Sequence, residues 1–67
     1  MADIAMLNEK IKESGITITA LSEKCGMSRE TFYNRMAEKS EFKASEITNL
    51  TEALNLTRRE RDQIFFG

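Results

Sequence analysis

The side chains with the most suggestive chemistry lie in the segment 28–36, "SRETFYNRM". On a helix, Phe32 and Met36 would face inward, and five polar residues would share the outer arc: Arg29, Glu30, Tyr33, Asn34 and Arg35. Arginine can bond bidentately to guanine and asparagine to adenine, while glutamate can accept a hydrogen bond from cytosine. This arc therefore carries chemistry suited to reading the edges of bases.

The same arc also has a plainer interpretation as a solvated helix face. Glu30 would lie in the first turn, where the helix dipole favours an acidic residue whatever its function, and Arg29 would be its solvated neighbour. Tyr33 could pack sideways along the helix. Asn34 is a mediocre helix former at an exposed site, which favours a role beyond structure. The residues alone leave both interpretations open.

The composition lacks the residue types that catalytic and metal sites commonly use. The chain has no histidine and one cysteine, Cys25, so it lacks an acid, base and nucleophile set and a set of zinc ligands. We therefore expect no enzyme activity, no catalytic residue, no metal, no cofactor and no small-molecule substrate. Cys25 is predicted to be a buried structural residue in a reducing interior.

Charge is distributed unevenly along the chain. The formal net charge is −1, whereas DNA-binding proteins usually carry a basic excess. Residues 24–43 nevertheless hold more cations than acids, namely Lys24, Arg29, Arg35, Lys39 and Lys43 against Glu30, Glu38 and Glu41. The first 23 residues are net negative. This pattern predicts a one-sided field that orients the molecule on DNA, with weak binding by a single copy.

The elements that must position the arc are predicted to be helices, because proline is absent and good helix formers fill most positions. A helix over 3–14 is expected to end at Gly15. Thr17 caps a second helix that ends at Gly26, and Ser28 caps the third, which contains the arc. Sixty-seven residues form one domain at most, so we expect a single all-α domain over residues 1–67.

Two further helices are predicted downstream. Residues 37–45 lose the helical period and are expected to form a loop with Phe42 in the core. A fourth helix starts at Lys43 or Ser45, and Asn55 can take the left-handed position at its end. The spacing T-x-x-E from Thr57 forms a capping box that opens a fifth helix, expected to run from about residue 58 to the end of the sequence.

Two short helices joined by a tight glycine-containing turn form a helix-turn-helix unit. The stretch "TITALSEKCGMSRETFYNRM" resembles the core of phage repressors of the Cro and cI type, also called XRE-like regulators. The later "EFKASEITNLTEALNLTRRERDQIFF" is similar to the remaining helices of small phage-like members. Ile18 stands where many members have glutamine, and Ala37-Glu38-Lys39 where many have Asn-Gly-Lys.

The resemblance implies a compact five-helix bundle of the lambda-repressor-like type that binds operator DNA as a two-fold dimer. Its recognition helix, about residues 28–36, would lie in the major groove. We expect base contacts from Arg29, Glu30, Tyr33 and Asn34. We expect phosphate contacts from Thr17, Thr19, Ser28, Arg35, Lys39, Ser40 and Lys43.

The expected function is sequence-specific binding of double-stranded DNA by a cytoplasmic transcriptional regulator, of the phage or mobile-element repressor type. No apolar run in the sequence is long enough for a signal peptide or a membrane span. The alternative is a helical protein-interaction module, such as an antitoxin or anti-repressor, that keeps the fold and has lost DNA affinity. The acidic balance of the chain favours this alternative.

The fifth predicted helix carries two adjacent phenylalanines, which lie about 100° apart on a helix and cannot both face one core. Phe66 is therefore predicted to be exposed and to form a contact in a weak homodimer; alternatively, it frays in solvent or covers a gap beside the first helix. Arg58 and Arg59 would lie in the first turn of this helix. They are expected either to pair with Glu60 and Asp62 or to serve an interface.

Overall fold

The computed structural model describes residues 2–67, and within that range it has no strand and five α-helices. The helices are α1 (Ile4–Ser14), α2 (Ile18–Lys24), α3 (Arg29–Met36), α4 (Ala44–Ala53) and α5 (Arg58–Phe65). The predicted all-α fold with five helices is confirmed. The predicted starts hold to within about one residue, and the fourth helix, whose start was ambiguous, begins at Ala44. Helix α5 ends at Phe65, whereas it was expected to continue to Gly67.

Four of the five helices begin at a side chain that accepts a backbone hydrogen bond. Asp3, Thr17, Ser28 and Thr57 each accept from the N–H group three residues later, at 3.0 or 3.1 Å. The capping box at Thr57 is closed by Glu60, whose Oε1 accepts from the Thr57 N–H at 2.9 Å. Because each cap satisfies an otherwise unpaired N–H group, the caps predicted at Thr17, Ser28 and Thr57 are confirmed as the points where their helices begin.

A residue with left-handed backbone conformation follows each of the first four helices. Gly15 and Gly26 have φ values of 72° and 70°, and Asn55 has a φ of 52°, as its predicted position requires. Glu38 also has a positive φ, 61°, after α3. There the Lys39 N–H bonds to the Asn34 carbonyl at 2.9 Å, which closes the end of α3. A glutamate at such a position lacks the conformational freedom of glycine.

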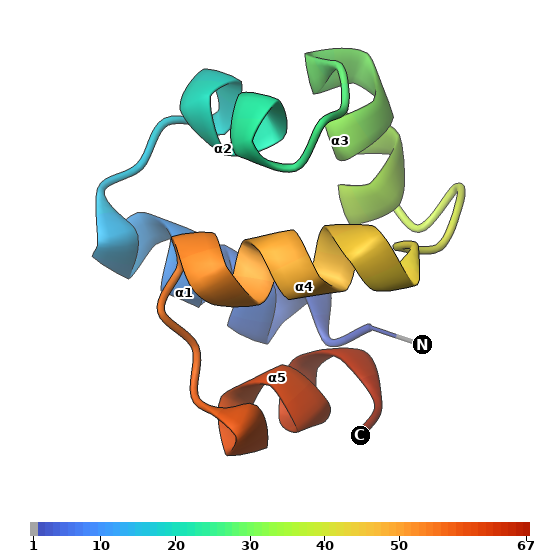
Figure 1. Cartoon of the computed structure of the whole chain (residues 1–67). Helices are drawn as coiled ribbons and strands as arrows, with labels where there is room; N and C mark the ends of the chain where they lie inside the picture. The colour runs from blue at the N-terminus through green and yellow to red at the C-terminus, as the bar shows by residue number, and fades with distance from the viewer. Residues whose placement is uncertain (1) are drawn as a thin grey trace.

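Helix α4 occupies the centre of the molecule. It contacts α2 on one side and α5 on the other, while α1 packs against α5 behind it (Figure 1). The backbone N–H of Asp3, just before α1, bonds to the Ile64 carbonyl of α5 at 2.6 Å. The pair α2 and α3 lies on one side of α4, and α5 lies on the other (Figure 1).

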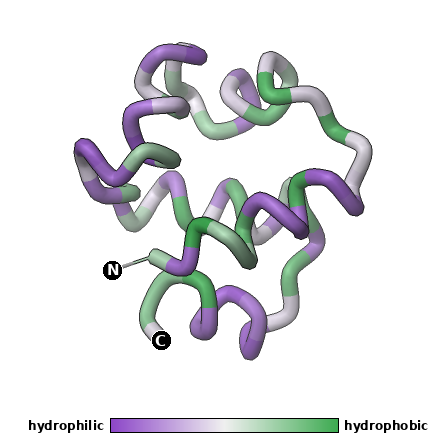
Figure 2. Tube along the Cα trace, turned by 180° about the vertical axis from the view of Figure 1, so that it is seen from behind, coloured by the Kyte–Doolittle hydropathy of each residue, from purple (hydrophilic) through white to green (hydrophobic). Residues whose placement is uncertain are grey.

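One core holds all five helices together. Its fully buried members include Leu7, Leu21, Phe32, Leu50 and Ile64, one from each helix. Hydrophobic and hydrophilic residues are interspersed along the helices (Figure 2), and the buried apolar residues among them make up this core. Burial of these side chains is the main favourable term in folding.

The loop between α3 and α4 contributes an aromatic side chain to the core. Phe42 lies edge-on to Phe32 and to Phe65, with ring centroids 6.3 and 5.4 Å apart. This confirms the prediction that Phe42 of the loop packs inward. Cys25 is 5% exposed and is buried as expected. None of the helices within residues 2–67 combines the length and apolar character needed to cross a bilayer.

Candidate nucleic-acid interface

The turn between α2 and α3, residues 25–28, fixes the direction in which α3 leaves the body of the molecule. Gly26 adopts its left-handed conformation here, and the Met27 N–H bonds back to the Ser22 carbonyl at 3.1 Å. Ser28 then caps α3 immediately. The side chain of Ser22 is buried and donates to the Ile18 carbonyl at 2.7 Å. The turn is therefore closed by a backbone bond to α2, and α3 begins directly after it.

Helix α3 has one buried side chain and an exposed opposite face. Phe32 is fully buried, as predicted, and Met36 packs against the core. Arg29 and Glu30 are exposed in the first turn, and Tyr33 is 49% exposed. Asn34 is half-buried. The structure thus brings three of the four residues predicted to contact bases onto one exposed face, with the fourth at its margin.

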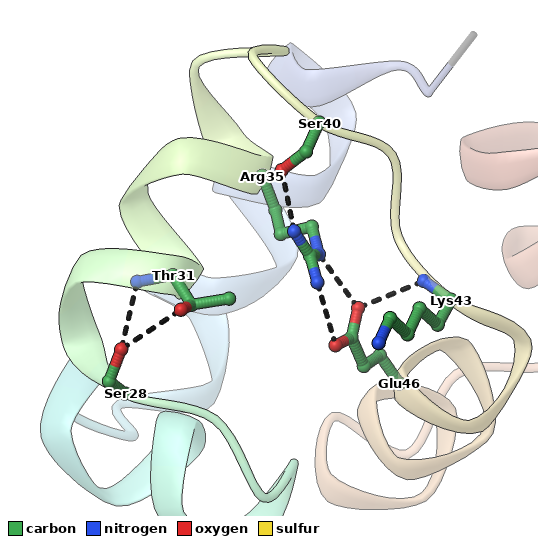
Figure 3. A network of polar contacts seen from close by, with 6 residues as sticks. All are labelled: Ser28, Thr31, Arg35, Ser40, Lys43 and Glu46. Atoms are coloured by element: carbon green, nitrogen blue, oxygen red, sulfur yellow. Dashed lines mark hydrogen bonds and ion pairs between the residues drawn. The ribbon is translucent and has the colours of Figure 1, made fainter.

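Arg35 does not share this outer arc as the sequence analysis expected. Its side chain, 11% exposed, turns inward to α4, where Nε and Nη2 donate to the two carboxylate oxygens of Glu46 at 2.9 and 3.2 Å (Figure 3). Nη1 donates to Ser40 Oγ in the loop. The guanidinium and the Ser40 hydroxyl, both expected at phosphates, therefore bond to partners inside the protein.

The position of Arg35 on the helix explains this difference. It follows Phe32 by three residues, so the two side chains lie on neighbouring parts of the helix surface and Arg35 borders the buried side. The start of α4 lies opposite this border and presents Glu46. A bidentate hydrogen-bonded pair of arginine and carboxylate is stronger than a bond between neutral groups, so Arg35 turns to Glu46.

Glu46 is the residue of this region that the sequence analysis missed. It is 6% exposed, and its Oε1 also accepts from the Lys43 backbone N–H at 2.9 Å, which stabilises the start of α4. The Arg35 guanidinium beside it, together with that N–H group, lowers the pKa of Glu46. Its place at the third position of a helix signals capping, but no local pattern indicates an ion pair with a residue eleven positions away.

The other residues predicted to contact phosphates differ in their exposure and in whether their polar groups already bond within the protein. Lys39, Lys43 and Thr19 are exposed. The hydroxyls of Thr17 and Ser28 accept bonds within their own helices, and Ser28 Oγ also donates to Thr31 Oγ1 at 3.0 Å. Exposed donors are therefore present on both sides of α3, at Thr19 in α2 and at Lys39 and Lys43 in the loop.

The ion pair changes the charge balance of this surface. With Arg35 neutralised by Glu46, the exposed charged residues of 24–43 are four cations and three acids: Lys24, Arg29, Lys39 and Lys43 with Glu30, Glu38 and Glu41. The excess of positive charge is therefore one. Residues 2–67 contain no group of three or more histidine, cysteine or acidic residues that could hold a metal ion.

A second surface feature lies at the end of α5. Phe66 is 67% exposed, as the sequence analysis predicted. It lines a cavity of about 380 Å³ together with Phe42, Ile47 and Phe65, and Glu38 and Glu41 also belong to that lining. It also lines a shallow groove along α5 with Arg58 and Arg59. Phe66 is thus the residue where the cavity and the groove meet.

The two arginines do not form the ion pairs that were one of their expected alternatives. Glu60 pairs with Lys10 of α1, and Asp62 pairs with Arg61 at 2.8 Å. Arg58 and Arg59 are exposed beside them. The other alternative, a role at an interface, stays a prediction.

Comparison of the chain with protein-family models, with curated proteins and with solved structures finds no match.

Proposed function

We propose that this chain is a sequence-specific binder of double-stranded DNA that acts as a cytoplasmic transcriptional regulator of the phage or mobile-element repressor type. In this proposal the five helices have the lambda-repressor-like arrangement. Helices α2 and α3 form its helix-turn-helix, and α3 lies in the major groove.

The observation that carries the proposal is the exposed face of α3 in a pair of short helices joined by a tight, hydrogen-bonded turn. Arg29, Glu30 and Tyr33 are exposed on a helix whose opposite side is anchored by the fully buried Phe32. Because such a helix is already ordered before it enters the major groove, binding carries no further loss of conformational entropy in its backbone. Arg29, in the first turn, is the proposed bidentate partner of a guanine.

Phosphate contacts are proposed for the exposed donors that flank α3. Lys39 and Lys43 follow its end in the loop, and Thr19 lies near the start of α2. Thr17 and Ser28 cap the starts of α2 and α3. The phosphates would therefore meet the backbone N–H groups at these helix starts as well as the two hydroxyls. Such contacts fix the position of a protein on the duplex but do not read its sequence.

A second function is favoured by one specific observation, the ion pair between Arg35 and Glu46. It leaves the exposed surface of residues 24–43 with a positive excess of only one charge. A surface so nearly balanced also suits a helical protein-interaction module without DNA affinity, such as an antitoxin or anti-repressor. Phosphate binding and its salt dependence separate the two functions.

The decisive experiment measures binding to a labelled duplex of random sequence by fluorescence anisotropy at several salt concentrations. We expect affinity to fall linearly on logarithmic axes as salt rises, because each neutralised phosphate releases condensed counterions. Lys39→Ala should lower the slope by about one unit, whereas Lys12→Ala, an exposed cation of α1, should leave it unchanged. Binding that is absent, or that does not respond to salt, would favour the protein-interaction module.

A further inference from the structure

The cavity of about 380 Å³ lies between the loop that joins α3 to α4 and the end of α5. We call it the aromatic cavity, because three of its apolar lining residues are Phe42, Phe65 and Phe66, beside Ile47 and Ala2. Ile47 and Phe65 are buried and form its inner part, whereas Phe66 is mostly exposed at its edge. Its volume falls within the range of small-molecule sites in proteins.

The three phenylalanines favour a flat apolar group inside the cavity. Phe42 and Phe65 lie edge-on to each other, with ring centroids 5.4 Å apart, so the wall is aromatic on two sides. A ligand against this wall would also remove part of Phe66 from water. The faces of aromatic rings attract organic cations and do not attract anions.

Two carboxylates lie at the mouth of the aromatic cavity. Glu38 and Glu41 belong to its lining and are exposed, and neither forms an ion pair with another of the residues 2–67. Glu38 also keeps its side chain at a φ of 61°, where a residue other than glycine is strained. Strained residues of this kind gather at ligand sites, so the strain supports a role for the Glu38 carboxylate.

The only basic residue in the lining already has partners. Arg35 donates through Nε and Nη2 to Glu46 and through Nη1 to Ser40, so its charge is balanced by a carboxylate behind the wall (Figure 3). An anionic ligand would have to displace one of these bonds and would also meet the two carboxylates at the mouth. The charges of the lining therefore select a cation.

We propose that the aromatic cavity binds an organic cation with a flat apolar body, of the arylalkylamine class. The ring of the ligand lies against Phe42 and Phe65, and its ammonium group lies between Glu38 and Glu41. This site is separate from the exposed face of α3, and its binding does not depend on the proposed DNA binding. With one ring and one charge, such a ligand binds weakly and reversibly.

Tryptamine is a suitable probe, with tryptophol and indolepropionate as its neutral and anionic counterparts. The chain contains no tryptophan, so indole fluorescence comes from the ligand alone. Titrating wild-type protein into each compound and following indole anisotropy gives the three affinities. We expect tryptamine to bind at least about tenfold more tightly than tryptophol, because only the ammonium group pairs with the carboxylates and the ring faces. Indolepropionate should bind more weakly than tryptophol.

Removal of the two carboxylates tests the assigned residues. Glu38→Gln with Glu41→Gln should lower the affinity for tryptamine at least about tenfold and leave that for tryptophol unchanged. Glu9→Gln with Glu52→Gln is the matched control, since it removes two exposed acids outside the cavity and should change neither affinity.

Phe66→Ser tests the apolar wall and should lower the affinities for tryptamine and tryptophol by similar factors. Because Phe66 is mostly exposed, circular dichroism should show an intact helical fold in this variant. Three results would overturn the proposal: no binding of tryptamine at millimolar protein concentration, equal affinities for tryptamine and tryptophol, or tighter binding of indolepropionate, which would assign the charge preference to Arg35. None of them would alter the salt-dependent DNA experiment.

Discussion

At the scale of single residues, two arginines of α3 have opposite environments. Arg29 is exposed in the first turn, whereas Arg35, six residues later, is held by Glu46 and Ser40. Residue type and spacing alone do not separate them, since both are arginines on a short amphipathic helix. The difference arises from α4, which places a carboxylate opposite one of them.

Arg29→Ala should lower affinity for the preferred DNA site much more than affinity for random duplex. A bidentate contact to a guanine contributes about 1–3 kcal/mol of discrimination against the wrong base, and random DNA lacks the matched base. Selecting sites from a random duplex library and comparing both affinities by anisotropy measures this effect. An equal loss on both kinds of DNA would make Arg29 a phosphate contact, which is the behaviour expected of Lys39→Ala.

Glu46→Gln should destabilise the fold by about 2 kcal/mol at neutral pH, because Arg35 then keeps its place with an uncharged partner. Asp62→Asn is the matched control. It removes the acidic partner of an exposed pair, whose side chains are 34% and 49% exposed, and should cost about 0.5 kcal/mol or less. Urea unfolding of both variants measures the difference, and equal costs would contradict a structural role for the buried pair.

The same pair makes stability depend on pH in a defined direction. The pKa of Glu46 is lowered in the folded state, chiefly by the bond from Arg35. Its contribution is therefore fully present above the unfolded value of about 4.3 and is lost as pH falls through the lower folded value. The pKa of Glu60, beside Lys10, is lowered too and acts in the same direction. Glu46→Gln should lose less stability than the wild type over this acidic range.

At the scale of helices and loops, the signals that lie within a few residues were predictable. Thr17, Ser28 and Thr57 are good capping residues that directly precede apolar periodic runs, and each begins a helix. The start of α4 was ambiguous because its N-cap, Lys43, has no side-chain acceptor. Glu46 instead accepts from the Lys43 backbone, so the boundary is set by a residue inside the helix.

The candidate site was predictable only where orientation follows from the helical period. The exposed face with Arg29 and Tyr33 follows from burial of Phe32. The inward turn of Arg35 depends on a contact between α3 and α4, which no pattern along α3 alone can reveal. The same limit applied to Ser40, because its bond to Arg35 requires the path of the whole loop.

Glu38→Gly should stabilise the protein by about 0.5–1 kcal/mol. The reason is that the Cβ atom of glutamate is strained at a φ of 61°, whereas glycine has no Cβ atom. Ala37→Gly is the control one residue earlier, where φ is −84°. There glycine only adds freedom to the unfolded chain and should cost about 0.5–1 kcal/mol. Thermal unfolding followed by circular dichroism measures both changes in stability. A lower melting temperature for Glu38→Gly would contradict this account.

At the scale of the whole molecule, a small core must support five short helices. Typical stabilities of 0.05–0.15 kcal/mol per residue give roughly 3–10 kcal/mol for a chain of 67 residues. The molecule is correspondingly compact, with a radius of gyration of 10.5 Å for its Cα atoms. The loss of one large buried side chain can therefore remove most of the stability.

Phe32→Ala should unfold much of the population at 37 °C, since truncating a buried phenylalanine costs about 3–5 kcal/mol. Phe32 is fully buried and also meets Phe42 edge-on, so its removal affects α3 and the loop together. Tyr33→Ala, on the exposed face of the same helix, should change stability by less than about 1 kcal/mol. Circular dichroism melting curves distinguish the two, and a wild-type melting temperature for Phe32→Ala would contradict the assigned orientation of α3.

Because Cys25 is buried at the turn between α2 and α3, its reaction with a thiol reagent reports transient opening of this turn. Cys25 is the sole cysteine of the chain, and burial, with a smaller effect from Glu46, raises the pKa of its thiol. A thiol reagent reacts with the thiolate and needs access, so labelling of the native protein should be slow and limited by the open population. The ratio of labelling rates in unfolded and native chains is then a protection factor. If opening requires complete unfolding, Glu38→Gly should raise the protection factor by the ratio that corresponds to its whole gain in the free energy of unfolding. If only this turn opens, Glu38→Gly should leave the protection factor unchanged.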